Sequence, residues 1–175
     1  MIDPDKKVLV AYYSRKGQNY TGGRIVNIPV GNTEVAARMI QQLIGGDLFE
    51  IRTVKTYPSD YTETTKVAQE EKRNNARPEL AAHLQNPDGY DTIFLGFPNW
   101  WNIPPMAVFT FLEAHDFTGK TILPFCTHEG SGMGVSEREI ARICPSAKIG
   151  KGLAIRGGDV NSSAAAIKLW LSRLP

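Results

Sequence analysis

The stretch YDTIFLGFPNWWNIPP, residues 90–105, joins an apolar run to two adjacent tryptophans and a pair of prolines. The run Tyr90–Gly96 has the length and apolar character of a strand that is buried on both faces of a parallel sheet. The prolines suit the first turn of a helix, so the sequence predicts a helix over Met106–Ala114. The tryptophans therefore lie on a loop that connects a strand to a helix.

Trp100 and Trp101 allow two interpretations at this point. A loop above a rigid scaffold is where many proteins hold a ligand. Two tryptophans can equally cover the end of a hydrophobic core and contact no ligand. The loop alone leaves both interpretations open.

The alternation of apolar runs with helical patterns continues along the whole chain. Strands are expected at Lys7–Tyr13, Leu48–Ile51, Thr92–Gly96, Thr121–Cys126 and around Gly152–Ile155. Further helices are expected at Val35–Ile44, which Gly45 and Gly46 end, at Ser136–Ile143, and after a cap at Ser162 or Ser163. Strands that alternate with helices predict an α/β fold, in which helices cover both faces of a parallel sheet.

The composition limits the classes of protein to consider. The 175 residues suit a single domain over residues 1–175, and 42% apolar residues are enough for a core. A net charge of +2, with both signs dispersed, gives no reason to expect nucleic acid or a membrane as a partner. The first apolar run is too short for a signal peptide. Cys126 and Cys144 form no disulfide framework, and Cys126 is expected to be an inert thiol in a buried strand. A cytoplasmic protein is the simplest expectation.

Ligands of parallel sheets bind at the carboxyl ends of the strands, so three loops matter: Ser14–Thr33, Phe97–Ile103 and Thr127–Gly134. In the first loop, Gly31–Thr33 stands at a helix start, where free N–H groups and the helix dipole favour an anion. A plain Asn or Thr helix cap without a ligand is the other open interpretation. The loop lacks the GxxxxGK[ST] pattern of a nucleotide-binding P-loop.

Residues 18–30 interrupt the first loop. Gly22 and Gly23 predict a tight turn between two extended arms, which would make a small hairpin. The hairpin is either a flap beside the anion end or a surface decoration.

The third loop has His128 followed by glycines, which let backbone groups approach a flat ligand. His128 could stack on such a ligand or hydrogen-bond to it, although a lone histidine is more often a surface residue. The three histidines are spread over separate elements, so no metal site is expected. Ser131 lies in GSG rather than in a GxSxG elbow, which argues against a serine hydrolase. No catalytic residue is assigned.

Together, these motifs resemble the flavodoxin family. They are YYSRKG at 12–17, GNT at 31–33, GFPNWW at 96–101 and CTHEGSG at 126–132, in the right order at three strand ends. The nearer similarity is to bacterial flavodoxin-like members with a Pro-x-Trp-Trp loop. The resemblance implies a flavodoxin-like three-layer sandwich, with a five-stranded parallel sheet in the order 2-1-3-4-5, and FMN bound non-covalently.

The resemblance also implies where FMN lies. The phosphate falls on Ser14, Lys16, Asn32 and Thr33, with Arg15 and Gly17 alongside. The flavin ring falls between a first loop of Pro98, Asn99, Trp100, Trp101, Asn102 and Ile103 and a second loop of Thr127, His128, Glu129, Gly130, Ser131 and Gly132. One tryptophan is expected to turn inward and the other outward.

The resemblance implies an FMN-binding electron-transfer flavoprotein, whose partners are redox proteins or small-molecule electron acceptors. The alternative is an FMN-dependent reductase that takes hydride from NAD(P)H and passes it to a quinone-type acceptor. A non-enzymatic FMN-binding module is a third class. The chain departs from strongly acidic flavodoxins in its slight positive charge, and a protonated His128 is expected to favour the reduced flavin.

Overall fold

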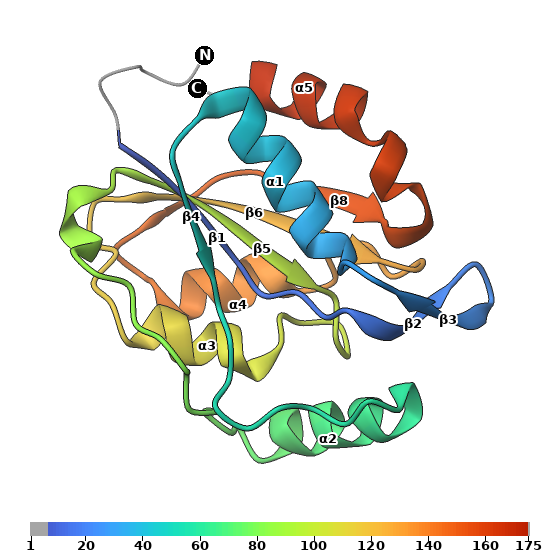
Figure 1. Ribbon diagram of the computed structural model, residues 1–175. Coiled ribbons are helices and arrows are strands. Elements are labelled where there is room, and N and C mark those ends of the chain that lie inside the picture. The colour runs from blue at the N-terminus through green and yellow to red at the C-terminus, as the bar shows by residue number, and fades with distance from the viewer. Residues whose placement is uncertain (1–6, 175) are drawn as a thin grey trace.

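A parallel β-sheet forms the middle layer of the molecule, as a computed structural model that describes residues 7–174 shows (Figure 1). The elements follow the order β1 (Val8–Tyr12), β2 (Gly17–Thr21), β3 (Arg24–Ile28), α1 (Asn32–Ile44), β4 (Asp47–Glu50), α2 (Tyr61–Arg73), η1 (Pro87–Gly89), β5 (Thr92–Pro98), α3 (Met106–Glu113), β6 (Thr121–His128), α4 (Ser136–Ile143), β7 (Lys148–Ile149), β8 (Leu153–Arg156), η2 (Gly157–Ser162) and α5 (Ala164–Ser172).

The strand order of the sheet agrees with the predicted one. Over residues 7–174 the main sheet has six strands, ordered β4-β1-β5-β6-β7, with β8 also paired to β6. Its pairings are parallel throughout. β7 pairs with the start of β6 and β8 with its end, so two short strands share the last position. The order 2-1-3-4-5 is confirmed, and the expected last strand is β8.

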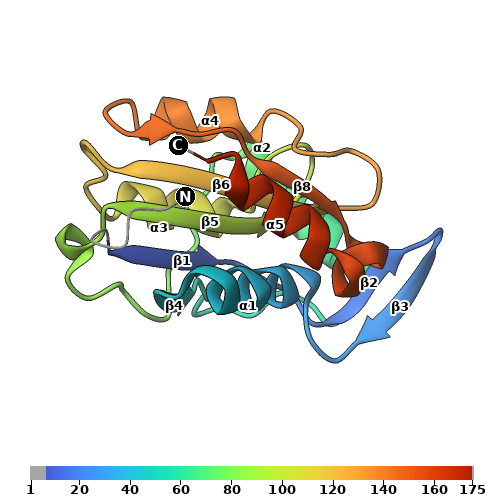
Figure 2. The same ribbon diagram turned by 90° about the horizontal axis from the view of Figure 1, so that it is seen from above.

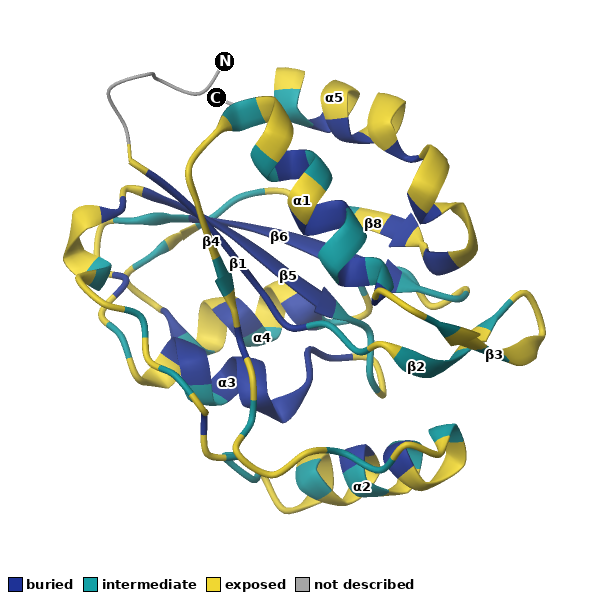
Figure 3. Ribbon diagram, in the orientation of Figure 1, coloured by how far each residue is buried: buried dark blue, intermediate teal, exposed yellow. Residues whose placement is uncertain are grey.

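The sheet is covered on both faces because successive residues of each strand point to opposite sides. Val10 and Tyr12 of β1 pack with α1 and α5 in one buried cluster. Leu9 and Ala11 pack with α3 and α4 in another. Figure 2 shows α1 and α5 in front of the sheet, and Figure 3 shows the central strands as almost wholly buried. The three-layer sandwich is therefore the observed architecture.

Helix α2 is an element that the sequence patterns did not predict as a whole. It lies beyond α3, away from the sheet, at the end where β5 points (Figure 1). Only Thr64 and Ala68 of this helix are buried. Asp60 begins it as an N-cap that accepts from the Glu63 N–H at 2.9 Å. In its last turn Glu70, Lys72 and Arg73 are exposed, and Glu71 accepts the Tyr57 hydroxyl at 2.7 Å.

The segment 18–30 forms the expected hairpin. β2 and β3 pair antiparallel, and Gly22 and Gly23 make the turn with φ values of 59° and 90°. The hairpin projects past the carboxyl edge of the main sheet (Figures 1 and 2). Tyr20 stacks on Tyr61 of α2 with ring centroids 6.2 Å apart. The hairpin thus reaches the helix across the end of the sheet.

Ser163 stands at the start of α5 but does not cap it. Its hydroxyl donates to the carbonyl of Val160, in the preceding η2 turn, at 2.7 Å instead of accepting an N–H group of α5. The expectation of a serine cap is wrong here. Cys126 and Cys144 are both free and buried, as expected of Cys126. Over residues 7–174, no helix is long and apolar enough to cross a membrane.

Gly96 in the middle of the sheet tests the packing. A Cβ atom at this position would overlap the Phe125 ring of the neighbouring strand. We expect Gly96→Ala to lower the free energy of unfolding by about 1–3 kcal/mol, as overpacking does. Urea denaturation measures this change in the free energy of unfolding. Gly89→Ala is the control, because its Cβ would meet nothing closer than 3.7 Å. Equal stability of both variants would contradict this account.

Candidate functional site

The carboxyl ends of β1, β5 and β6 open onto a cleft of about 110 Å³, which we call the strand-end cleft. It is lined by Arg15, Asn19, Tyr20, Asn32, Thr33, Tyr61, Pro98, Asn99, Trp100, Thr127, His128, Glu129 and Gly157. Several of these residues also line an adjoining cavity of about 310 Å³ beneath α2. Together the two spaces fall in the size range of small-molecule sites, roughly 300–1,000 Å³.

The start of α1 is prepared for an anion. The Glu34 N–H donates to the Ser14 hydroxyl at 3.0 Å, and the Val35 N–H donates to the Gly31 carbonyl at 3.1 Å. In the described part of the chain, the N–H groups of Asn32 and Thr33 have no protein acceptor. Free N–H groups at a helix start attract negative charge. This end of the cleft therefore fits a phosphate group.

The Thr33 side chain has a structural partner. Its buried hydroxyl shares a hydrogen bond of 2.8 Å with the hydroxyl of Thr127, at the end of β6. Thr33 therefore offers its N–H to a ligand, while its hydroxyl joins two strand-end loops. A plain Asn or Thr cap is not what begins α1, since the capping oxygen comes from Ser14.

The tryptophan loop is a tight turn. Trp100 and Ile103 exchange backbone hydrogen bonds of 3.0 and 3.3 Å, with Trp101 and Asn102 between them at φ values of 55° and 76°. Two positive φ values are typical of a type I′ turn, which sends adjacent side chains in different directions. The turn thus separates the two tryptophans.

Trp100 turns inward and Trp101 outward, as expected. The Trp100 ring lies edge-on to Tyr13 at 5.4 Å and to Tyr57 at 5.1 Å, measured between centroids. Trp101 is 45% exposed, and its ring N–H donates to the Thr65 carbonyl of α2 at 2.9 Å. Trp100 is therefore one aromatic wall of the strand-end cleft, and Trp101 anchors α2.

Asn99 fixes the distance between the second and third loops. Its side-chain NH₂ group donates to the Gly132 carbonyl at 2.8 Å, and its side-chain oxygen accepts the Asn102 N–H at 2.9 Å. The Asn99 N–H also donates to the Thr127 carbonyl at 2.8 Å. The spacing between the two loops is thus set by hydrogen bonds of the protein.

Arg15 lies at the junction of the cleft and α2. Its guanidinium donates to the carbonyls of Gln18, Pro58 and Ser59, the last two at 2.8 and 2.9 Å, and to the Thr64 hydroxyl at 3.1 Å. Burial lowers the pKa of Arg15, but an arginine remains charged near neutrality. Instead of reaching toward the start of α1, Arg15 holds the start of α2.

The third loop differs from expectation at two side chains. The His128 Nδ1 accepts the Gly130 N–H at 2.9 Å, so this nitrogen carries no proton. Burial is the main cause that lowers the pKa of His128, and Arg156 lowers it further against the opposite effect of Glu129. Glu129 itself accepts the N–H groups of Gly22 at 3.2 Å and Gly158 at 2.9 Å. The hydrogen bond at Nδ1 and the lowered pKa both favour the neutral imidazole, and an effect of a protonated His128 on the reduced flavin stays a prediction.

The structure brings half of the predicted residues to the cleft. Arg15, Asn32, Thr33, Pro98, Asn99, Trp100, Thr127, His128 and Glu129 line it. Ser14, Lys16 and Gly17 line a larger cavity on the other side of the first loop. Trp101 lines the adjoining cavity, whereas Asn102, Ile103, Gly130, Ser131 and Gly132 line none of these three spaces. Contact with FMN itself stays a prediction for all of them.

Sequence reasoning missed four lining residues: Asn19, Tyr20, Tyr61 and Gly157. No sequence pattern pointed to Gly157, because its place in the lining depends on close packing with Glu129 across the site. A Cβ at this glycine would lie 2.7 Å from a Glu129 carboxylate oxygen. Tyr20 had a signal in part, because an aromatic residue in a predicted flap suggests that the flap covers something, whereas Tyr61 begins α2, which the sequence patterns did not predict as a whole.

The chain belongs to the flavodoxin family, since the family model described as flavodoxin matches residues 7–174. A crystal structure from Bacteroides eggerthii DSM 20697, assigned as a flavoprotein, is 29% identical, with a TM-score of 0.77 and coverage of 96% of this chain and 97% of that one. Another from Bacteroides uniformis ATCC 8492, assigned likewise, is 30% identical, with a TM-score of 0.74 and coverage of 96% and 99%.

A flavoprotein of Lactobacillus acidophilus NCFM, crystallised in complex with FMN, shares the fold at 21% identity. Its TM-score is 0.66, and the match covers 93% of this chain and 99% of that one. No curated protein matches the chain.

The state of His128 gives a pH prediction. Its pKa lies below the ordinary 6.5, so the unfolded chain takes up a proton first as the pH falls. The free energy of unfolding should therefore decrease as the pH drops below 6.5. NMR titration of the imidazole measures the pKa, and His128→Gln should lack this component of the pH dependence. A His128 pKa above 6.5 would refute the assignment.

Proposed function

We propose that this protein binds FMN non-covalently in the strand-end cleft and carries electrons between redox partners. The observation that carries the proposal is that one cleft joins the free N–H groups of Asn32 and Thr33 to the ring of Trp100. A phosphate fits the first end, and a flat ring system fits the second. Bound FMN would supply the redox chemistry, and the protein supplies binding, orientation and electrostatics.

Support comes from the position of the cleft and from the relatives. It lies at the carboxyl ends of parallel strands, where such folds bind ligands, and a protein of the same fold is crystallised with FMN. The hairpin and α2 border the cleft through Tyr20 and Tyr61, which would limit the access of water to the ligand. Two buried free thiols suit the reducing cytoplasm proposed from the sequence.

The basic test is reconstitution of the purified protein with FMN. We expect a bound flavin whose fluorescence is quenched, since Trp100 borders the cleft. Failure of FMN, FAD and riboflavin to bind at micromolar concentration would reject the proposal.

Comparison of FMN with riboflavin, which lacks the phosphate, tests the orientation. Hydrogen bonds to a charged group are worth roughly 1.5–3 kcal/mol, so FMN should bind at least about tenfold more tightly. Asn32→Ala, which removes the side-chain amide at the proposed phosphate end, should weaken FMN and leave riboflavin nearly unchanged. Trp100→Leu is the contrasting variant and should weaken both ligands alike. Fluorescence titration measures all four affinities, and equal losses for Asn32→Ala would place Asn32 away from the phosphate.

A second candidate function has one observation in its favour. The adjoining cavity of about 310 Å³ is lined by Tyr61, Trp100 and Trp101, among others, and shares a wall with the cleft. Such an aromatic space beside a bound flavin suits a flat acceptor, as an NAD(P)H-dependent reductase of quinones requires.

Steady-state turnover separates the two functions. An electron carrier should show no oxidation of NADH or NADPH that depends on an added quinone. A reductase should show it, and Ala68→Leu should then lower the rate by narrowing the adjoining cavity without changing FMN affinity. Thr62→Leu on the exposed side of α2 is the control. Turnover that Ala68→Leu does not alter would exclude this cavity as the acceptor site.

A further inference from the structure

The hairpin of β2 and β3 borders the strand-end cleft on the side that the sheet leaves open. The hairpin follows the carboxyl end of β1, and η2 follows the carboxyl end of β8. Asn19 and Tyr20 of the hairpin, Gly157 of η2 and Tyr61 of α2 all line the cleft. These three segments therefore enclose the space above the strand ends, and a ligand has to pass them to enter or leave.

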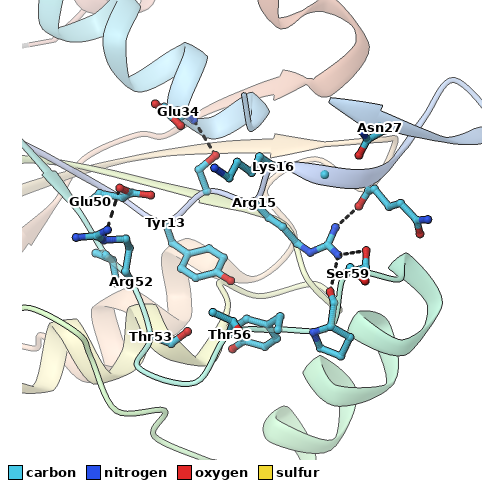
Figure 4. Close-up of a pocket in the computed structure, with 16 residues that line it drawn as sticks. Tyr13, Arg15, Lys16, Asn27, Glu34, Glu50, Arg52, Thr53, Thr56 and Ser59 are labelled. Atoms are coloured by element: carbon cyan, nitrogen blue, oxygen red, sulfur yellow. Dashed lines mark hydrogen bonds and ion pairs between the residues drawn. The ribbon is translucent and has the colours of Figure 1, made fainter. Parts of the chain in front are cut away.

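The base of the hairpin is firmly attached to its surroundings. The Arg15 guanidinium donates to the Gln18 carbonyl and, at 2.9 Å, to the Ser59 carbonyl before α2 (Figure 4). The Gln18 side chain accepts the Tyr61 N–H at 2.8 Å, and the Asn19 side chain donates to the Arg15 carbonyl at 3.0 Å. The start of β2 is therefore fixed to α2 and to the end of the β1 strand.

The tip of the hairpin is held differently, by the Glu129 carboxylate. Its two oxygens accept the Gly22 N–H at 3.2 Å and the Gly158 N–H at 2.9 Å. These two hydrogen bonds, which we call the hairpin latch, join the hairpin turn to η2. Arg156 lies 3.6 Å from the same carboxylate, and the Glu129 side chain is only 15% exposed. Hydrogen bonds are stronger where little water surrounds them, so the latch is suited to keep the tip in place.

Thr21 opposes the closed position of the tip. Its hydroxyl is buried and, among residues 7–174, has no hydrogen-bond partner. The closeness of η2 explains this burial, since a Cβ added to Gly158 would lie 3.5 Å from the Thr21 methyl group. A hydroxyl that loses water without gaining a partner is destabilising. Ile25, beside the turn, is 48% exposed, so apolar burial contributes little there. The closed tip therefore depends on the latch.

We propose that Glu129 is a positioning residue, whose latch closes the hairpin over the cleft and sets the rates at which FMN enters and leaves. The inference rests on the FMN binding proposed above and adds what controls its kinetics. Although Glu129 lines the cleft, both of its oxygens accept N–H groups of the protein.

The latch affects the two rates in a characteristic way. It consists of protein groups alone, so it forms with or without a ligand in the cleft. Its strength therefore cancels from the equilibrium affinity, while the fraction of open molecules limits both entry and exit. A side chain that touched FMN would act differently, because lost contacts with a ligand change mainly its dissociation rate.

The first test is stopped-flow measurement of FMN association and dissociation in Glu129→Gln. A glutamine side chain has one acceptor oxygen, so one of the two glycine N–H groups loses its partner. We expect both rate constants to rise about tenfold, while the dissociation constant changes by less than about twofold. Glu137→Gln is the matched control, because Glu137 accepts the Gly152 N–H at 2.6 Å and does not line the cleft.

Thr21→Val tests the same balance in the opposite direction. Valine keeps the shape of threonine and removes the hydroxyl that has no partner, so it should stabilise the closed tip. Both rate constants should then fall several-fold at nearly unchanged affinity. Faster association in Thr21→Val would contradict the proposal.

Hydrogen exchange of the protein without FMN reports on the latch itself. The Gly22 and Gly158 amides should exchange about tenfold faster in Glu129→Gln, and the Gly152 amide should be unchanged. If the wild-type protein binds no FMN, the proposed function and the gate both fail. If it binds FMN, the gate alone is overturned by unchanged exchange, by a rise in the dissociation rate without a rise in association, or by an equal effect of Glu137→Gln.

Discussion

The hydrogen bond from the Glu34 N–H to the Ser14 hydroxyl is the contact on which the site depends. It joins the end of the β1 strand to the first turn of α1, although a whole hairpin lies between them in the sequence. The approach is possible because Gly31 has no Cβ, which would overlap the Ser14 hydroxyl and lie 2.8 Å from the Arg15 carbonyl oxygen. With the loop closed in this way, the N–H groups of the first α1 residues are left facing the cleft.

Two charged side chains attach the added elements to this closed loop. Arg15 holds the start of α2 through carbonyl oxygens, and Glu129 holds the hairpin turn and the start of η2 through N–H groups. Hydrogen bonds with one charged partner are roughly twice as strong as neutral ones. The hairpin and α2 bury little apolar surface, so these bonds contribute much of what positions them. The walls of the cleft thus depend on polar contacts rather than on the core.

The sheet and the three loops could be predicted because their signals are local. The apolar run at Tyr90–Gly96 and the glycines of the hairpin turn specify their own structure. Helix α2 could not be predicted in this way, because it packs through a few small or polar residues and its sequence shows no apolar stripe. The direction of Arg15 and the hydrogen bond of His128 depend on segments far away or on backbone geometry, which residue types do not reveal. For this reason sequence reasoning found the loops but not the hydrogen bonds that their side chains make within the protein.

The electrostatics of the cleft follow from the same contacts. The acceptors around Arg15 are carbonyl groups and a hydroxyl, so no carboxylate cancels its charge in these bonds. The Glu129 carboxylate is partly offset by two N–H groups and by Arg156 at 3.6 Å. Charge interactions weaken slowly with distance in a poorly solvated site, so Arg15 favours an anion without touching it. A guanidinium and backbone N–H groups do not titrate near neutrality. The attraction of the cleft for an anion therefore does not change with pH in this range, whereas the attraction of a histidine would.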